Sequence, residues 1–248
     1  MKRPISFGRV VNFARRMPAV LTQPERLYAQ EAIKKIWPEA SPKDIEQLRY
    51  EYYKNDDLFL DVDRLSLSKR RRRAQWEPWL EFQYMLVRMH KPEIYVETGV
   101  FDGISSAVIL QAMEDNNKGR LVSIDLPATE PIKGATDHML EGSLPPGVNP
   151  GWCVPQRLRN RYDLRLGDAR ELLPAALKEL GKIDIFFHDS LHTYDHMIFE
   201  YRCAWPHLKD GGFVVSDDIF ANPAMLHFSK EVGRKYLNIR NGFGCVRK

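Results

Sequence analysis

The chain has 248 residues, 44% of them hydrophobic, and a formal net charge of +4. This length allows one large domain with a buried core, and the charge is too small to indicate a nucleic-acid partner by itself. No apolar stretch approaches the roughly 18–20 residues of a membrane span, and the basic N-terminus lacks the apolar core of a secretory signal. Three scattered cysteines form neither a disulfide framework nor a metal-ligand pair, which favours a reducing, cytoplasmic location; they are Cys153, Cys203 and Cys245.

Residues 1–90 are charged, aromatic and helical in pattern, and we interpret them as an N-terminal helical extension or cap rather than an independent domain. Ser41 and Pro42 are typical of a helix start, whereas Lys91-Pro92 indicates a helix end. Helices are predicted over residues 26–36, 43–54 and 75–90.

Two basic stretches of this extension have no assigned chemistry. The first lies within residues 1–16, and we favour a packing arm or a contact between copies of the chain over a membrane surface. The second, Lys69 to Arg73, is more typical of a solvated helix face than of a site for acidic lipid or RNA.

From residue 91 onward, predicted strands and helices alternate, which favours a doubly wound, mostly parallel sheet. Asn241-Gly242 is a turn pair between two short apolar runs, so the chain ends in a hairpin that adds an antiparallel strand. Strands are predicted at 94–98, 120–125, 162–166, 183–187 and 212–216, and helices at 104–114, 169–180, 195–208 and 224–236.

The first predicted strand leads into a glycine-containing turn. Gly99 and Gly103 frame the turn, and missing side chains there would let a ligand approach the backbone. Asp125 ends the next strand, where an acid suits the hydroxyls of a ribose. The spacing of the two glycines is Gly-x-x-x-Gly, whereas dinucleotide-binding loops have G-x-G-x-x-G. In addition, the carboxylate of Glu97 would repel a pyrophosphate but attract a sulfonium or ammonium group. The loop therefore favours S-adenosylmethionine (SAM) over NAD, with a strand–helix turn that binds no ligand as the alternative.

Five segments together resemble class I SAM-dependent methyltransferases. They are VETGVFDGISS, SID, LGDARELLP, IDIFFHDSLHTYDHM and LKDGGFVVSDDI, and the resemblance covers roughly residues 76–248. Within that class the chain is similar to the branch of catechol and macrolide-sugar O-methyltransferases and cephalosporin-hydroxylase-like proteins. The resemblance implies a Rossmann-like α/β methyltransferase domain over residues 91–248, with a seven-stranded sheet of order 3-2-1-4-5-7-6.

The resemblance also implies a set of cofactor-binding residues. Glu97 and Gly99 would lie near the methionine part of SAM, Asp125 at the ribose and Asp168 near the adenine. Asp168 is alternatively the N-cap of the helix that begins at residue 169. The complete candidate set is Glu97, Gly99, Gly103, Ser105, Asp125, Asp168 and Ala169.

Acidic and histidine side chains follow the two strands predicted at 183–187 and 212–216. Asp189 ends the first strand, Asp217 and Asp218 end the second, and neighbouring parallel strands would bring the three carboxylates together. Their mutual repulsion calls for a cation, and oxygen ligands suit Mg²⁺, Mn²⁺ or Ca²⁺. The resemblance implies Mg²⁺ at these acids and a general base at His192, which follows Asp189 in a D-x-x-H motif. Capping of helices and turns is the alternative role of the acids.

Other residues carry weaker expectations. Residues 127–155 are too long for a simple connector, so they are expected to cover the active site or contact the acceptor, with Trp152 as a candidate lining residue. His188 is as consistent with a buried structural histidine as with a functional one. His196 and His207 are interpreted as helix surface.

The sequence thus predicts a SAM-dependent O-methyltransferase that is assisted by a divalent cation, with His192 and Asp189 as catalytic residues. The acceptor is expected to be a small hydroxylated molecule, with a sugar favoured, and neither nucleic acid nor a transmembrane segment is expected. A metal-independent N- or carboxyl-methyltransferase, a SAM-binding protein without turnover and an RNA-modifying enzyme remain alternatives. A homo-oligomer is left open.

Overall fold

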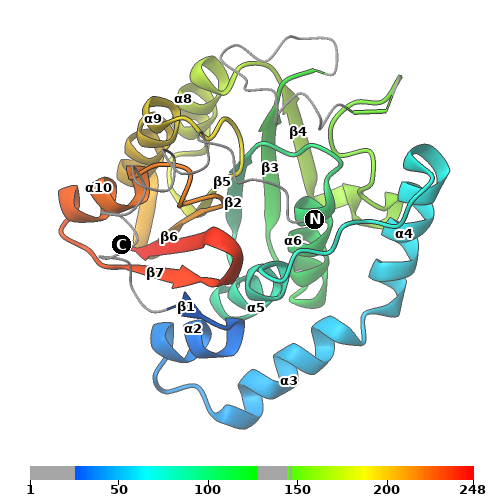
Figure 1. The fold of residues 1–248 in the computed structure, drawn as a ribbon, viewed down its shortest axis with the longest axis horizontal. Helices are drawn as coiled ribbons and strands as arrows, with labels where there is room; N and C mark the ends of the chain where they lie inside the picture. Colours follow the sequence, from blue (N-terminus) through cyan, green and yellow to red (C-terminus); the bar gives the residue numbers. More distant parts are fainter. Residues whose placement is uncertain (1–25, 128–143, 146) are drawn as a thin grey trace, which may run out of the picture.

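The computed structural model describes residues 26–127, 144–145 and 147–248. Within these residues, helices cover both faces of one eight-stranded sheet, whose order is β1-β7-β8-β6-β5-β2-β3-β4 (Figure 1). The strands are β1 (Arg26–Leu27), β2 (Ile94–Thr98), β3 (Arg120–Asp125), β4 (Tyr162–Leu166), β5 (Ile183–His188), β6 (Leu208–Ser216), β7 (Tyr236–Ile239) and β8 (Phe243–Arg247). The α-helices are α2 (Ala29–Ile36), α3 (Pro42–Tyr53), α4 (Asp56–Arg70), α5 (Leu80–His90), α6 (Ile104–Asp115), α8 (Ala169–Leu180), α9 (Tyr194–Ala204) and α10 (Ala224–Glu231).

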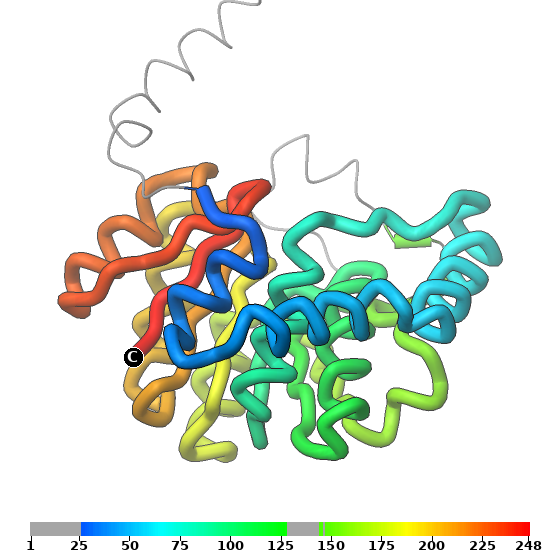
Figure 2. Tube along the Cα trace, turned by 90° about the horizontal axis from the view of Figure 1, so that it is seen from below, coloured from blue at the N-terminus to red at the C-terminus, as the bar shows by residue number. Residues whose placement is uncertain are grey.

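The strand order confirms the expected topology. From β4 to β7 the strands follow one another as β4-β3-β2-β5-β6-β8-β7. If β2 is counted as strand 1, this is the expected order 3-2-1-4-5-7-6. The strand β8 runs antiparallel to both of its neighbours. The short strand β1 adds an eighth position, parallel to β7. In Figure 2 the chain around β1 and α2, in blue, therefore lies beside the C-terminal hairpin in red.

Two apolar layers hold the helices on the sheet. One contains side chains of α2, α5 and α6, such as Ile33, Phe82 and Ile109, together with the sheet residue Phe187. The other contains side chains of α8, α9 and α10 and Phe186 on the opposite face of the same strand. Because consecutive residues of a strand face opposite sides, the continuous apolar run of β5 supplies both layers.

Several predicted boundaries differ from the structure for local reasons. The helix expected from residue 26 begins at Ala29 because Arg26 and Leu27 pair with β7. The helix expected over 75–90 begins only at Leu80, and an additional helix, α4, precedes it. The helix expected over 195–208 ends at Ala204, and a short 3-10 turn that contains Pro206 leads into β6. The basic stretch within residues 1–16 and most of the 127–155 loop lie outside the described residues.

Candidate functional site

The carboxyl ends of β2, β5 and β6 open onto a cleft with a volume of about 210 Å³. Parallel strands of an open α/β sheet place their ligand sites at this edge. The glycine turn after β2 lines one side, Asp189 and Asp217 line another, and the chain between α4 and α5 completes the wall. The lining residues are Ser66, Arg70, Arg72, Arg73, Ala74, Gln75, Glu77, Trp79, Leu80, Val100, Phe101, Asp102, Gly103, Ile104, Ser105, Asp189 and Asp217.

The two glycines of the turn have a packing role that the sequence did not reveal. Gly99 has φ +79°, and a Cβ atom there would lie 2.0 Å from the backbone oxygen of Asp189. Gly103 has φ +88°, and its Cβ atom would lie 2.7 Å from Cα of Gly151. Both contacts are shorter than any real Cβ contact, so glycine is required for the turn to fit against β5 and residue 151. The ligand approach proposed for these glycines is therefore not needed to explain them.

Asp125 holds the backbone of the same turn. Its Oδ2 accepts hydrogen bonds from the N–H groups of Val100, at 2.9 Å, and Phe101, at 2.8 Å. Burial raises the pKa of this carboxyl, although the backbone hydrogen bonds oppose the shift. Asp168 caps α8 by accepting from the N–H of Arg170 at 2.8 Å, and Ala169 is buried behind it. The structure thus assigns both acids a structural contact, and their contact with SAM stays a prediction.

Glu97 lies fully buried at the end of β2. Its Oε1 accepts hydrogen bonds from the hydroxyls of Ser106 and, at 2.6 Å, Ser123, while its Oε2 is buried with no partner among the described residues. Burial raises the pKa of Glu97 to about 7. The hydroxyls explain how an acid is tolerated inside the sheet, and the unpartnered oxygen leaves it able to accept from a positively charged donor.

Asp189, His192 and Asp217 come together beside the glycine turn. Each offers one potential ligand atom, and these atoms lie within 4.8 Å of one another. The N–H of Asp189 donates to the carbonyl of Thr98 at 2.8 Å, and that of Asp217 donates to the carbonyl of His188 at 3.0 Å. Hydrogen bonds between adjacent strand ends therefore hold Asp189 and Asp217 next to each other, as expected for acids that follow neighbouring parallel strands.

Asp218 stands slightly apart from this group. Its backbone adopts φ +49°, and 60% of its side chain is exposed. Its Oδ2 lies 3.7 Å from Nδ1 of His192, while Nε2 of His192 lies 3.7 Å from Oδ1 of Asp189. The imidazole is thus placed between two carboxylates, at distances longer than a hydrogen bond.

Burial and mutual repulsion shift the pKa values of the groups in this cluster. Burial and the neighbouring Asp217 raise the pKa of Asp189 well above its ordinary value, and burial and Asp218 raise that of Asp217 to about 7. Burial and His188 lower the pKa of His192 to about 3, and its Nε2 has no partner among the described residues. Two acids that resist ionisation beside a neutral imidazole form a donor set that a divalent ion would satisfy.

A family of known proteins matches the part of the chain that builds this cleft. The model of a methyltransferase domain family matches residues 96–219, from β2 to just beyond β6. The chain belongs to this family. A search of curated proteins finds no significant match.

Solved structures of other methyltransferases share the fold. An O-methyltransferase from Bacillus cereus in complex with SAH superposes with a TM-score of 0.52 and 14% identity, covering 78% of this chain and 92% of the other. The O-methyltransferase TomG from Streptomyces achromogenes, involved in tomaymycin synthesis and solved with SAM, also gives 0.52, with 17% identity over 78% and 89% of the chains. At these identities the likeness concerns the fold, and the present chain is a methyltransferase with the class I architecture. No helix in the described part of it is long and apolar enough to cross a bilayer.

The structure of this methyltransferase contains a buried polar network behind the acids, which the sequence did not predict. Glu200 of α9 is fully buried, with one oxygen 2.5 Å from Nδ1 of His188 and the other 2.9 Å from Nε2 of His196. Thr98 and Ser190 donate to the same carboxylate at 2.6 and 3.0 Å. Burial opposes ionisation, but the two histidines hold the pKa of Glu200 well below its usual range. The network ties α9 to the ends of β2 and β5.

The network also corrects one expectation. His196 was expected on a helix surface but is only 5% exposed. The signal in the sequence was its spacing from Glu200, because residues at i and i+4 share a helix face. His207 is half-buried in the 3-10 turn that follows α9, where its Nδ1 is 2.8 Å from the carbonyl oxygen of Gly181.

Asp102 links the glycine turn of the methyltransferase to its N-terminal helices. Arg70, the last residue of α4, forms a two-pronged ion pair with Asp102, and Nε1 of Trp152 donates to the same carboxylate at 2.9 Å. Trp152 therefore supports the turn and is not among the cleft-lining residues. The guanidinium of Arg70 also lies 4.7 Å from the centre of the Phe101 ring.

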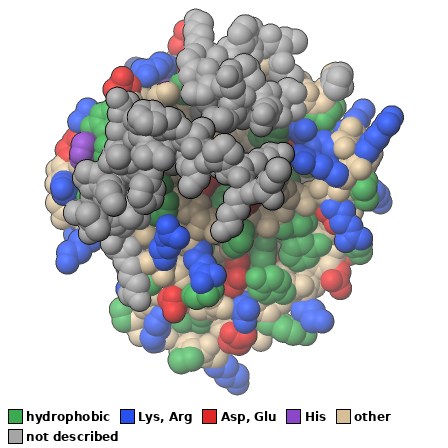
Figure 3. Space-filling view, in the orientation of Figure 1, with side chains coloured by type: hydrophobic (Ala, Val, Ile, Leu, Met, Phe, Trp, Pro, Cys, Tyr) green, Lys and Arg blue, Asp and Glu red, His purple; other side chains and the backbone are tan. Residues whose placement is uncertain are grey.

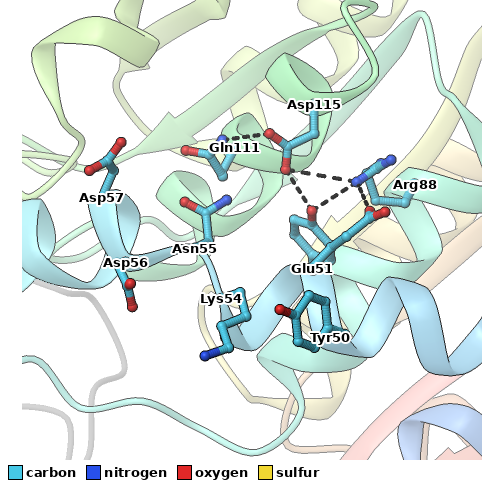
Figure 4. Close-up of a pocket in the computed structure, with 10 residues that line it drawn as sticks. Tyr50, Glu51, Lys54, Asn55, Asp56, Asp57, Arg88, Gln111 and Asp115 are labelled. Atoms are coloured by element: carbon cyan, nitrogen blue, oxygen red, sulfur yellow. Dashed lines mark hydrogen bonds and ion pairs between the residues drawn. The ribbon is translucent and has the colours of Figure 1, made fainter.

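A second hollow of about 570 Å³ lies between the α3–α4 junction and the C-terminal end of α6 (Figure 4). Tyr84 donates to Asp115 at 2.6 Å, Gln111 donates to Asp115 at 2.8 Å, and Arg88 pairs with Glu51. These groups bond mainly to one another across α3, α5 and α6. The hollow is therefore a polar seam that joins the helical extension to the core, remote from the acids at the strand ends.

Proposed function

We propose that this methyltransferase transfers the methyl group of SAM to a hydroxyl oxygen of a small acceptor with the help of a divalent cation such as Mg²⁺. The observation that carries the proposal is the convergence of Asp189, Asp217 and His192 beside the glycine turn. A sugar or another hydroxylated metabolite is the acceptor class that we favour.

The cofactor residues fit SAM by charge and position. Glu97 keeps an unpartnered oxygen beneath the turn, where an ammonium or sulfonium group would be attracted. Ser105 lines the cleft at the start of α6. Gly99, Gly103 and Asp125 act on SAM through the turn whose shape they fix, and Asp168 and Ala169 border the same edge of the sheet at the start of α8.

The acids fit a divalent cation. Asp189 and Asp217 would hold it, with Asp218 as the adjoining carboxylate, and the cation would lower the pKa of the acceptor hydroxyl. His192 is neutral at physiological pH because its pKa is lowered to about 3. A base with so low a pKa is weak, so to take the acceptor proton at Nδ1 or Nε2 the imidazole would depend on Asp218 and Asp189 to stabilise the imidazolium. In such a site the acceptor oxygen, the methyl carbon and the sulfur would line up for direct displacement.

Turnover of SAM tests the proposal across a panel of hydroxylated sugars and phenols, with added Mg²⁺ and with a chelator. We expect activity that the chelator removes. Asp189→Asn should abolish the metal dependence and most turnover while SAM still binds, and His192→Ala should lower turnover by roughly 10²–10⁴-fold. Asp210 is an exposed acid at the opposite end of β6. Asp210→Asn is therefore the matched control, and it should change neither the metal dependence nor the turnover. Full activity in chelator would exclude the cation.

A further inference from the structure

One wall of the proposed acceptor cleft is basic. Arg70, Arg72 and Arg73 line it together with the two acids Asp189 and Asp217. Arg71 is the C-cap residue of α4 and adopts the left-handed conformation, with φ 56°; residues 72–75, which follow this turn, line the cleft. Lys and Arg side chains also gather at the right of Figure 3, over the region where Figure 1 draws α4. The run interpreted from sequence as a solvated helix face therefore borders the candidate site.

The backbone that carries these arginines is anchored. The buried hydroxyl of Ser66 donates to the carbonyl of Arg72 at 2.9 Å. Oδ1 of Asp63 accepts from the N–H of Ala74 at 3.0 Å and from Nε1 of Trp76 at 3.3 Å. The arginine side chains thus extend from a segment held at both ends, which favours a built binding wall over a mobile charged loop.

The three arginines differ in their charge partners. Arg70 is paired with Asp102 and supports the glycine turn. Arg73 lies 3.8 Å from Asp63, a weak pair since 82% of the Arg73 side chain is exposed. Among the described residues (26–127, 144–145 and 147–248), ion pairs in this run are formed by Arg70 and Arg73 but not by Arg72. Arg72 and Arg73 therefore retain the capacity to bind an anion.

We propose that Arg72 and Arg73 bind an anionic group of the acceptor, so that the substrates are hydroxylated carboxylic acids such as uronic acids or dihydroxybenzoates. This inference rests on the proposed function, which places the reacting hydroxyl at Asp189 and Asp217. A hydroxy acid satisfies both ends of the cleft, with its hydroxyl at the acids and its carboxylate at the guanidinium groups.

Two observations favour the acceptor over the carboxylate of SAM and over a polyanion. Arg72 and Arg73 lie outside residues 96–219, the part of the chain that the methyltransferase family shares, as expected of residues that select the acceptor. Glu77, Asp189 and Asp217 share the cleft with the arginines. A nucleic acid or lipid surface would be repelled by these acids, whereas a single small acid can avoid them.

Binding measured by NMR titration tests the inference with two matched pairs of probes: D-glucuronate against D-glucose, and protocatechuate against catechol. We expect the native protein to bind each acid about tenfold or more tightly than its neutral partner. The double variant Arg72→Gln/Arg73→Gln should lose this preference. The double variant Lys69→Gln/Arg71→Gln removes the same charge from the same run but not from the cleft wall, and it should keep the preference.

Three outcomes would overturn the inference: no binding of either acid, equal binding of acid and neutral partner, or an equal loss of preference in both double variants. SAM itself also carries a carboxylate, and calorimetry with SAM tests whether the arginines bind that group rather than the carboxylate of the acceptor. If Arg72→Gln/Arg73→Gln weakens SAM binding and leaves the acids unaffected, the arginines bind the cofactor instead. Failure of the proposed function has a different signature, since SAM would then not be turned over with any acceptor even though the acids bind.

Discussion

Glu97 is a single carboxyl whose burial should be visible in the stability of the whole protein. Its pKa in the folded protein is about 7, above the ordinary value of 4.5, because burial disfavours the charged form. The folded state therefore holds this proton more tightly than the unfolded state. The resulting contribution to stability is complete below about pH 4.5 and is lost as pH rises through 7, to a total of about 3 kcal/mol.

Replacing Glu97 with Gln should remove this pH dependence. The amide oxygen can still accept from Ser106 and Ser123, but no proton is released. We expect the variant to be more stable than the native protein at pH 8 and to show a flatter stability profile between pH 5 and pH 8, measured by urea unfolding without SAM. Glu39→Gln, at an exposed site, is the control. An unchanged slope in Glu97→Gln would show that Glu97 ionises normally.

Gly99 is expected to tolerate no side chain at all. In Gly99→Ala, the Cβ atom would meet the carbonyl oxygen of Asp189 at 2.0 Å, and the left-handed backbone adds about 1–2 kcal/mol. Both unfolding free energy and SAM affinity should fall, since the turn and the strand end of Asp189 move together. Gly233→Ala has a similar φ, +65°, with no neighbour within 4 Å, so it isolates the backbone cost. Equal destabilisation of the two variants would refute the steric argument.

At the scale of elements, the ion pair between Arg70 and Asp102 couples α4 to the glycine turn. Only 15% and 8% of the two side chains are exposed. In Arg70→Ala the Asp102 carboxylate keeps the donor Trp152 but loses its counter-ion inside the protein, which costs about 3 kcal/mol.

Denaturant unfolding and SAM titration together measure this coupling. Arg70→Ala should lose both stability and SAM affinity, and Arg70→Ala/Asp102→Asn should recover part of the stability because no charge is left buried. Arg64→Ala removes an exposed arginine from the same helix and should change little, since 79% of its side chain is in contact with solvent. Normal SAM affinity in Arg70→Ala would mean that the turn holds its shape without α4.

At the scale of the molecule, we propose that residues 1–90 are a cap that folds together with residues 91–248. The helix α5 is buried along nearly its whole length, and Trp79 just before it stacks on Phe243 of the last strand with ring centres 4.6 Å apart. Removing the cap would expose a large apolar face of the sheet and of α6.

A chain that starts at Glu93 should therefore aggregate or lose fixed tertiary structure, which near-ultraviolet circular dichroism and gel filtration would reveal. Supplying residues 26–92 as a separate chain during expression is the control, and it should restore part of the soluble protein. Full stability and activity of the shortened chain alone would contradict the proposal.

Local patterns in the sequence determined much of the fold. Buried strands read as short apolar runs, glycine and proline mark their ends, and alternation with helices implies a parallel sheet. The sequence also predicted that Asp189 and Asp217 would lie together, because adjacent parallel strands end at one edge. These features depend on neighbours along the chain or on a topology common to the class.

Only the tertiary structure decided the features that depend on contacts between segments far apart in sequence. Gly99 needs its missing side chain because residue 189 crosses it, and His196 is buried because Glu200 meets His188 and Thr98 behind the strands. The basic run borders the cleft because Arg70 reaches Asp102, 32 residues away. No periodicity or motif records such contacts, since their energy arises only when the folded chain brings the two segments together.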